Sequence, residues 1–255
     1  MILQRGDVVG ERFKVRVIQP MWQTTYAEFY LGKMSGIEML VLLKVGRHFI
    51  QREYEILHKL RHPYVVRILE YGFIEEDAFL MMPYYNGLTL EDLVSEHGRL
   101  QEALVLQIGK RLGEVLWYFE ERDRPILHND IKPSNIILRE DGQIVLLDFG
   151  LACEEGEKIG AVLFQGSLGY AAPECWHIEE GNLSKATEVF ALGATLYRLL
   201  TGQKPAEHYG NFCLEGYGVH PYWEKVIKKC CTLETKYRYQ NAAQVLDALS
   251  HIKIK

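Results

Sequence analysis

The spacing of apolar residues changes partway along the chain, and this change constrains the fold more than any other feature. In the first third, apolar and polar residues alternate as they do in strands, with turn residues between the runs. From Leu88 onward, apolar residues instead recur three and four positions apart, as on one face of a helix. A strand-rich lobe followed by a helical lobe is therefore expected.

The individual elements can be predicted from the same pattern. In the first region we expect strands at residues 12–18, 27–33, 38–45, 65–71 and 78–82. A helix carrying Phe49, Glu53, Leu57 and Leu60 on one stripe is expected to end at or shortly before Pro63. In the second region we expect helices at 100–121, 183–202 and 240–252, and a hairpin of 136–138 with 144–147.

These elements predict an α+β fold with two lobes in a single domain of residues 1–255. The N-terminal lobe, a small antiparallel sheet with one helix, would span about residues 1–82. A joining segment at about 83–87 would lead to the larger, mainly helical lobe at about 88–255. No internal repeat or low-complexity linker interrupts this plan.

Composition excludes several classes of function. The formal net charge of −5 argues against nucleic acid as the main partner. Neither a signal peptide nor a membrane span is expected, since no apolar run is long enough, and a cytoplasmic location follows. The five cysteines are odd in number and lack a C-x-x-C spacing, so we expect reduced thiols rather than disulfides or a zinc site.

The strongest chemical signal is a polar cluster in the second lobe. Asp130 and Asn135 lie five residues apart in the segment His128-Asn129-Asp130-Ile131-Lys132-Pro133-Ser134-Asn135. Asp148 follows thirteen residues after Asn135, at the end of an expected buried strand. Carboxylate and amide oxygens that converge at a strand end suit Mg²⁺ and phosphate. The segment therefore predicts a phosphate-handling site.

Three motifs together resemble the signature of the eukaryotic-type (Hanks-type) Ser/Thr protein kinases, bacterial ones included. They are D-x-K-P-x-N at Asp130–Asn135, Asp148-Phe149-Gly150, and Ala172-Pro173-Glu174. The resemblance covers practically the whole chain, from about residue 10 to 252. It implies the bilobal protein-kinase fold and transfer of the γ-phosphoryl group of ATP to a protein with Mg²⁺, or Mn²⁺, as the metal.

The resemblance also implies roles for individual residues. Asp130 would orient the substrate hydroxyl or accept its proton, and Lys132 would stabilise the moving phosphoryl group. Asn135 and Asp148 would hold the metal. Ser167 would bridge Asp130 and Lys132, which together with Lys132 itself favours Ser/Thr over tyrosine substrates. The residues implied in nucleotide contacts are Lys44, Leu42, Phe29, Met82, Tyr85, Ile137 and Asp148.

The family pattern pairs Lys44 with a glutamate of the following helix, and two candidates exist. Glu53 shares the apolar stripe with Leu57, whereas Glu55 is rotated by about 200° to the far side. Counting back nine residues from His62-Pro63, as the family pattern does, also selects Glu53. We therefore expect a Lys44–Glu53 pair. Further along the chain, the family pattern pairs Glu174 with Arg238 and places Glu188 where the family has an aspartate that anchors the catalytic loop.

Three departures from the family pattern bear on ATP binding. The expected phosphate-covering loop, residues 19–27, contains no glycine, and Pro20 removes a backbone donor. Leu42 and Phe29 are larger than the family's usual alanine and valine, which predicts a tight adenine pocket. Only nine residues separate Lys44 from Glu53, so residues 45–47 would form a short turn and the helix would begin at about His48.

The chain also lacks both parts of the phosphorylation switch that is usual in the family. Asn129 occupies the position of the arginine that precedes the catalytic aspartate in the family pattern, and residues 151–165 contain no Ser, Thr or Tyr. We therefore expect control by a protein partner, by localisation or by expression.

Two other functions compete with an active kinase. A pseudokinase scaffold that binds a protein partner would explain the glycine-free loop and the tight pocket. A small-molecule phosphotransferase of the aminoglycoside-kinase type shares H-x-D-x-x-x-x-N, but Lys132, Gly150 and the segment 166–174 disfavour it. The protein substrate and the oligomeric state stay open.

Overall fold

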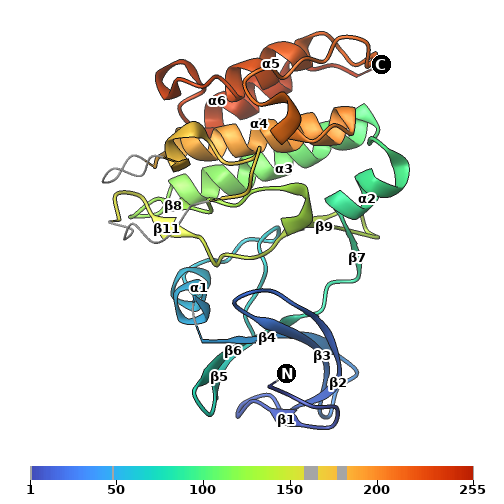
Figure 1. The fold of residues 1–255 in the computed structure, drawn as a ribbon, viewed down its shortest axis with the longest axis vertical. Helices are drawn as coiled ribbons and strands as arrows, with labels where there is room; N and C mark the ends of the chain where they lie inside the picture. The colour runs from blue at the N-terminus through green and yellow to red at the C-terminus, as the bar shows by residue number, and fades with distance from the viewer. Residues whose placement is uncertain (1, 48, 158–165, 177–182, 255) are drawn as a thin grey trace. The chain divides into compact units, whose positions relative to one another are not determined.

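The structure is a computed structural model that describes residues 2–47, 49–157, 166–176 and 183–254. Its chain divides into two compact units, Met1–Asn86 and Gly87–Lys255 (Figure 1). The division falls inside the segment expected to join the two lobes. Strands dominate the first unit and helices the second, as the α+β prediction requires.

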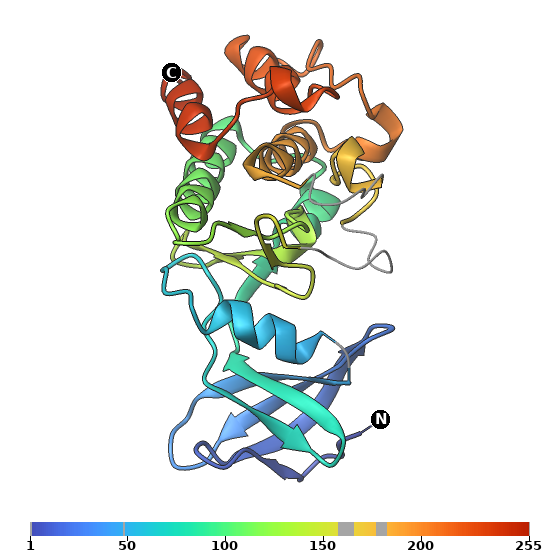
Figure 2. The ribbon, with the colours of Figure 1, turned by 90° about the vertical axis from the view of Figure 1, so that its left-hand side faces the viewer.

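The first unit is built on one antiparallel sheet. Its six strands are arranged in the order β1-β2-β3-β4-β6-β5. The single α-helix among the described residues of this unit, α1 (Ile50–Leu57), packs against β4 and β6 (Figure 2). The strands are β1 (Val8–Val9), β2 (Val15–Gln23), β3 (Glu28–Met34), β4 (Leu40–Gly46), β5 (Glu70–Ile74) and β6 (Asp77–Pro83).

Alternation along the strands separates the two faces of this sheet. Tyr30, Val41 and Leu43 point into a buried apolar core on one face. Because successive side chains of a strand point to opposite faces, Leu42 and Lys44 lie on the other face. The sequence pattern therefore puts Lys44 on the side away from the core.

Two predictions for the first unit were partly wrong. The strand expected at residues 65–71 begins only at Glu70, because Val65 and Val66 are buried in a turn-containing segment after Pro63 rather than in a ladder. The turn expected at residues 45–47 is mostly strand, since β4 runs to Gly46. His48, the expected helix start, lies outside the described residues. Phe49 is the N-cap, with a φ of 67°, and α1 begins at Ile50.

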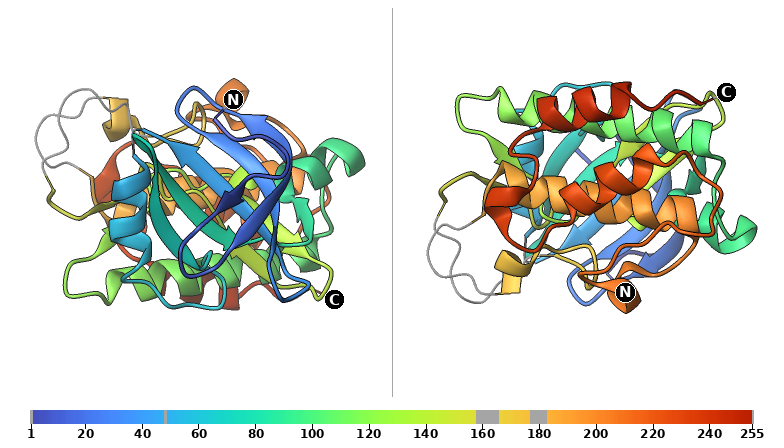
Figure 3. Two further views of the ribbon diagram at one scale, coloured as in Figure 1. Left: turned by 90° about the horizontal axis from the view of Figure 1, so that it is seen from below. Right: turned by 90° about the horizontal axis from the view of Figure 1, so that it is seen from above.

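Helices form the body of the second unit. The longest, α3 (Glu102–Glu120) and α4 (Lys185–Thr201), pack against each other, with α6 (Ala242–Ser250) beside α3 and α5 (Tyr222–Cys230) beside α4 (Figure 3). α2 (Leu90–His97) packs against α4. Short 3₁₀ turns complete the set: η1 (Pro133–Asn135), η2 (Pro173–Trp176), η3 (Pro205–His208) and η4 (Thr235–Tyr237). Across the described ranges, no helix combines the length and the apolar character that crossing a membrane would need.

Short strands in the second unit place the polar cluster. The predicted hairpin is confirmed as β9 (Ile136–Arg139) paired with β10 (Ile144–Leu146), and β7 (Gly87–Thr89) lies on the other side of β9. A second pair joins β8 (Ile126–Leu127) to β11 (Cys153–Glu154). The segment 128–135 therefore connects β8 to β9, and the segment 147–152 connects β10 to β11.

Candidate active site

The Asp130 carboxylate is surrounded by three hydrogen-bond donors. Its Oδ1 accepts from Ser167 Oγ at 2.7 Å, and its Oδ2 accepts from Lys132 Nζ at 2.7 Å and from Asn135 Nδ2 at 2.9 Å. Lys132 Nζ also donates to Ser167 Oγ at 2.6 Å, so the bridge expected at Ser167 is present. Asp130 and Asn135 are buried, and this network holds the carboxylate in one orientation.

The backbone before Asp130 is anchored by a buried glutamate of α4. The two carboxylate oxygens of Glu188 accept from the backbone N–H groups of His128, at 3.0 Å, and Asn129, at 2.9 Å. Burial raises the pKa of Glu188 to about 7, although the two N–H donors act in the opposite direction. The longer glutamate thus reaches the same segment that the family's aspartate anchors.

The His128 ring links this segment to the strand that precedes Asp148. Its Nδ1 accepts from the Asp130 backbone N–H at 3.2 Å, so its Nε2 carries the proton and donates to Leu147 O at 3.0 Å. Burial lowers the pKa of His128, which keeps the ring neutral. The Leu147 backbone N–H donates in turn to Asn135 O at 2.8 Å. Two hydrogen bonds therefore tie the two motif segments together.

Asp148 and Phe149 point in different directions. Phe149 is fully buried against His128, with ring centroids 4.5 Å apart, and against Phe119, at 5.8 Å. Asp148 is exposed and has a left-handed backbone with a φ of 56°. Its Oδ1 accepts from the Gly150 backbone N–H at 3.4 Å. The buried phenyl ring thus positions a carboxylate that stays accessible.

Gly166 allows Ser167 to reach Asp130. Its φ of 115° lies in a region that favours glycine, and a Cβ at this position would lie 3.0 Å from Asn129 O and 2.8 Å from the Ala171 Cβ. Any larger residue would push the Ser167 segment away from the loop that carries Asp130.

The Ala172-Pro173-Glu174 motif is held by the ion pair expected with Arg238. Arg238 Nη1 and Nη2 contact the two Glu174 oxygens at 2.6 and 2.8 Å, and the Arg238 side chain is fully buried. Burial alone would raise the pKa of Glu174, but the guanidinium holds it below its usual value. Thr187 of α4 adds a hydrogen bond to Glu174 at 2.9 Å. The segment that carries Ser167 is thereby fastened at its far end.

The Lys44–Glu53 pair expected in the first unit is present. Lys44 Nζ lies 2.6 Å from Glu53 Oε2, and the two side chains are 10% and 1% exposed. Glu55 is exposed and accepts instead from Gln51 of the same helix at 2.9 Å. Helical periodicity therefore identified the inward-facing glutamate correctly.

The register of β3 and β4 decides which residues are neighbours on the sheet face that carries Lys44. Leu31, not Phe29, lies directly opposite Leu42, whereas Phe29 lies directly opposite Lys44. The Phe29 ring is 5.6 Å from Lys44 Nζ and stacks on Trp22, with centroids 4.6 Å apart and planes 17° from parallel. Strand register decides which residues face each other, and local sequence does not determine that register.

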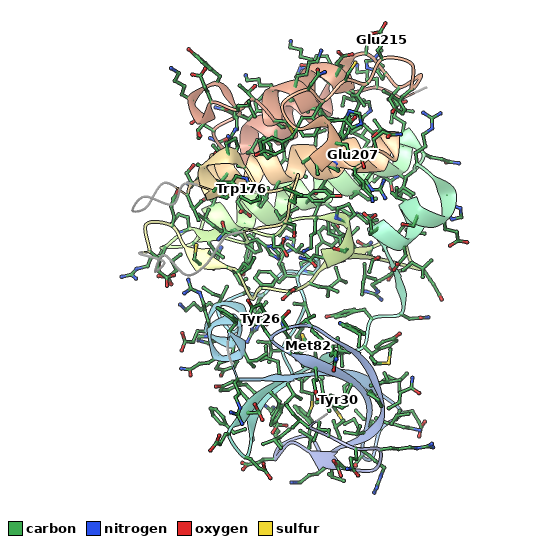
Figure 4. All side chains as sticks on the ribbon, in the orientation of Figure 1. Tyr26, Tyr30, Met82, Trp176, Glu207 and Glu215 are labelled. Atoms are coloured by element: carbon green, nitrogen blue, oxygen red, sulfur yellow. The ribbon has the colours of Figure 1, made fainter. Side chains whose placement is uncertain are left out.

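The structure also describes the other residues that were expected to contact the nucleotide. Met82 is buried on β6, directly opposite Leu42 (Figure 4). Tyr85 is half-buried, and its hydroxyl accepts from the Arg67 backbone N–H at 3.2 Å. In the second unit, Ile137 is half-buried on β9.

The glycine-free stretch 19–27 is not the long loop that was expected. β2 continues to Gln23, with register shifts between Val17 and Gln19 and between Pro20 and Trp22. The turn to β3 is short and closes with Thr24 N donating to Ala27 O at 2.8 Å. Without glycine to allow left-handed backbone, this stretch stays extended, and Pro20 is tolerated at the irregular part of the ladder.

Several contributors were missed from the sequence. Leu31 lies two residues after Phe29 on β3, and Trp22 lies opposite Phe29 on β2. Strand alternation together with the register would therefore have found both. His128 stood inside the quoted motif, but its ring was given no role. Within the described ranges, no group of three or more His, Cys, Asp or Glu side chains forms a metal cluster.

Comparisons with known proteins agree with this geometry. Residues 43–247 match the model of the protein kinase domain family. The chain is 30% identical to serine/threonine-protein kinase B of Synechocystis sp. over 226 residues, which is 82% of this chain and 38% of that protein. It is 29% identical over 251 residues to the serine/threonine-protein kinase cds1 of Schizosaccharomyces pombe, which is 89% of this chain and 54% of that protein.

A third relative is a probable serine/threonine-protein kinase PknB of Lactococcus lactis, 27% identical over 218 residues, or 80% of this chain and 34% of that protein. The chain thus spans only about a third to a half of the length of these relatives. The family model nevertheless covers most of the chain, including every motif quoted above. The chain therefore belongs to the protein kinase family, in its eukaryotic-type serine/threonine group.

Proposed function

We propose that this domain transfers the γ-phosphoryl group of ATP to serine or threonine hydroxyls of a protein substrate, with Mg²⁺ or Mn²⁺ as the metal. The observation that carries this proposal is the network around Asp130, in which Ser167, Lys132 and Asn135 all donate to one buried carboxylate. A structural carboxylate does not need both a lysine and a serine from a distant segment. A carboxylate that must meet a substrate hydroxyl in one orientation does need such neighbours to hold it.

The available donors suit the proposed metal. Asn135 uses its amide nitrogen for two bonds to Asp130, to the backbone oxygen at 2.8 Å and to Oδ2 at 2.9 Å, which leaves its amide oxygen as a ligand. Asp148 offers an exposed carboxylate. One carboxylate and one amide are a donor set typical of Mg²⁺ that also binds phosphate oxygens. Bound Mg²⁺–ATP would supply the phosphoryl group and neutralise the charge on it.

The protein's own residues would do the remaining work. Asp130 would accept a hydrogen bond from the substrate hydroxyl and take its proton as the bond from that oxygen to the γ-phosphorus forms, while the bond to the β–γ bridging oxygen breaks and ADP leaves. Lys132, 2.7 Å from Asp130, would balance the negative charge that gathers beside that carboxylate. Ser167 would keep the two groups at their present spacing.

The first unit would hold the nucleotide. Lys44, oriented by Glu53, would bind the α- and β-phosphates. Leu42, Phe29, Met82, Tyr85 and Ile137 would contact the nucleotide base and sugar. Leu31 belongs with this set, because it faces Leu42 across the sheet.

The test is transfer of label from γ-labelled ATP to a generic protein substrate with Mg²⁺ or Mn²⁺. We expect Asp130→Ala and Asp148→Ala each to reduce transfer to background. Asp123→Ala changes an exposed carboxylate outside the site and serves as the matched control. Transfer that survives both active-site changes, or that falls equally in the control, would contradict the proposal.

A pseudokinase scaffold is the second candidate, and one observation favours it. The Trp22–Phe29 stack lies beside Lys44, and the short Thr24–Ala27 turn offers no glycine-rich backbone for phosphate. A thermal-shift assay with millimolar ATP and Mg²⁺ separates the two functions. Stabilisation of wild type that is lost in Lys44→Met favours the enzyme, and an unchanged melting temperature favours the scaffold.

Regulation is proposed to act without phosphorylation of the segment after Asp148. Asn129 Nδ2 donates to Leu151 O at 3.0 Å and contacts Cys153 Sγ at 3.2 Å. The side chain that replaces the usual phosphate-binding arginine therefore already fastens the start of this segment. Residues 158–165, the rest of the stretch expected to lack a phosphorylation site, lie outside the described residues. Control would instead come from a protein partner, from localisation or from expression.

A further inference from the structure

The first unit carries a groove on its surface that the proposed reaction does not use. The groove has a volume of about 650 Å³. Its walls come from the segment before β2, from the C-terminal half of α1 and from the segment 60–71. Phe13, Tyr54 and Tyr71 supply aromatic surface. A space of this size holds a drug-sized ligand or a short run of side chains.

The lining of this groove is strongly cationic in an otherwise acidic chain. Three arginines, Arg12, Arg61 and Arg67, carry this positive charge, and His58 and His62 also line the groove. The chain as a whole carries a formal net charge of −5. Positive charge is therefore concentrated at the groove, where it attracts anionic groups.

The one carboxylate in the lining does not neutralise these cations. Glu70 accepts three backbone N–H bonds, from Glu11 at 2.6 Å, Arg12 at 3.1 Å and Phe13 at 2.8 Å. These donors hold the pKa of Glu70 below its usual value, although burial acts in the opposite direction. Glu70 thus serves to fix the chain before β2, and its single negative charge leaves the three arginines of the lining in excess.

Two of the arginines are well placed to meet a ligand. Arg12 and Arg67 are exposed, and Arg67 uses its backbone N–H, not its guanidinium, to bond Tyr85. Arg61 is held differently, because its Nη1 donates to the His58 and Leu60 carbonyls at 3.1 and 2.7 Å. Arg12 and Arg67 are therefore the residues to test.

The aromatic part of the wall indicates a ligand that has apolar surface as well as negative charge. The Tyr54 and Tyr71 rings stack with centroids 4.3 Å apart and planes 11° from parallel. Phe73, which is 65% exposed, extends this surface from Tyr71, with centroids 5.4 Å apart. A phosphate ion fills only a small part of about 650 Å³ and covers none of these rings.

We propose that this groove binds an acidic peptide segment of a partner protein, with an aromatic side chain against the tyrosines and flanking carboxylates against Arg12 and Arg67. The charge of the groove and the size and aromatic character of its wall together select this occupant. Tyr54 is the neighbour of Glu53 on α1, so the bound segment touches the helix that holds the partner of Lys44. The binding itself does not depend on the proposed reaction.

The test uses the full chain and a rhodamine-labelled peptide of sequence Glu-Glu-Asp-Phe-Asp-Glu-Glu, followed by fluorescence polarisation. We expect saturable binding. The binding should weaken as the salt concentration of the assay rises from about 0.05 M to about 0.5 M, because salt screens exposed charges. Arg12→Glu and Arg67→Glu should each weaken binding about tenfold, since each reversal replaces an attraction with a repulsion. Arg5→Glu, an exposed arginine of the same unit outside the groove, should leave the affinity unchanged.

Two further arms separate the peptide from other occupants. A peptide with serine in place of phenylalanine should bind at least about fivefold more weakly, because the aromatic wall then has no partner. Hydrogen exchange should slow in residues 60–71 on peptide binding. Absence of binding, equal weakening by Arg5→Glu, or displacement by inorganic phosphate as effective as by unlabelled peptide would each overturn the proposal.

Discussion

Replacing Glu53 with glutamine tests whether the Lys44–Glu53 contact is a buried ion pair on which the first unit depends. The two charged atoms lie 2.6 Å apart, and Glu53 is only 1% exposed. Glutamine keeps the shape of the side chain and one oxygen acceptor but removes the negative charge. The Lys44 ammonium would then stay buried and lose the compensating charge of Glu53.

The size of the expected loss follows from this burial. Breaking a buried ion pair by removing one partner costs about 3–5 kcal/mol, and the retained acceptor places Glu53→Gln at the lower end, about 3 kcal/mol. For a chain of this length, each kcal/mol lowers the melting temperature by about 2–4 °C, so we expect a fall of roughly 6–12 °C. The double variant Lys44→Met/Glu53→Leu removes both charges and should be close to wild type in stability.

Urea unfolding and thermal melts of wild type, Glu53→Gln, the double variant and Glu55→Gln provide the measurement. Glu55→Gln is the matched control, because Glu55 lies two residues further along the same helix and is exposed. Its change should stay within about 0.5 kcal/mol. A loss below about 1 kcal/mol in Glu53→Gln, or an equal loss in the control, would refute a buried pair. Label transfer should fall in Glu53→Gln and be retained in Glu55→Gln.

Three further predictions concern the second unit. Arg238→Lys should lower the free energy of unfolding by about 3 kcal/mol, since lysine cannot make the two-pronged contact with Glu174; equal melting temperatures would contradict this. The raised pKa of Glu188 stabilises the fold fully below pH 4.5, and this contribution is lost as the pH rises through about 7. Glu188→Gln should therefore remove a pH dependence on the order of 3 kcal/mol between pH 4.5 and 8, seen in urea melts across that range; parallel curves for both proteins would speak against it. Phosphatase treatment should leave label transfer unchanged, since Asn129 already holds the segment after Asp148, and a several-fold loss would disprove this.

Much of the candidate site was predictable because its signals are local. The period of apolar residues separated the strand-rich unit from the helical one, and helical rotation chose Glu53 over Glu55. The spacing within the motif segment grouped Asp130 with Asn135, and the resemblance to the family added Ser167 to their network. Family resemblance then supplied the long-range pairing of Glu174 with Arg238.

What escaped prediction depends on contacts between distant segments. Which residue lies opposite Leu42 is a matter of strand register, and no single strand contains that information. The strand expected from residue 65 begins only at Glu70, because Val65 and Val66 are buried in an irregular segment that follows a turn. The loop expected at 19–27 is shorter than predicted, because β2 stays paired with β3 as far as Gln23.

The cationic groove shows most clearly the difference between what the sequence predicts and what only the structure reveals. Arg12, His58 and Arg67 are unremarkable surface residues in the linear sequence, where they lie far apart. The sequence by itself determined the two kinds of unit and the grouping of Asp130 with Asn135, because period and spacing act over a few residues. Only the tertiary structure decided which strands face each other and which arginines share a groove, because those contacts depend on the packing of segments tens of residues apart.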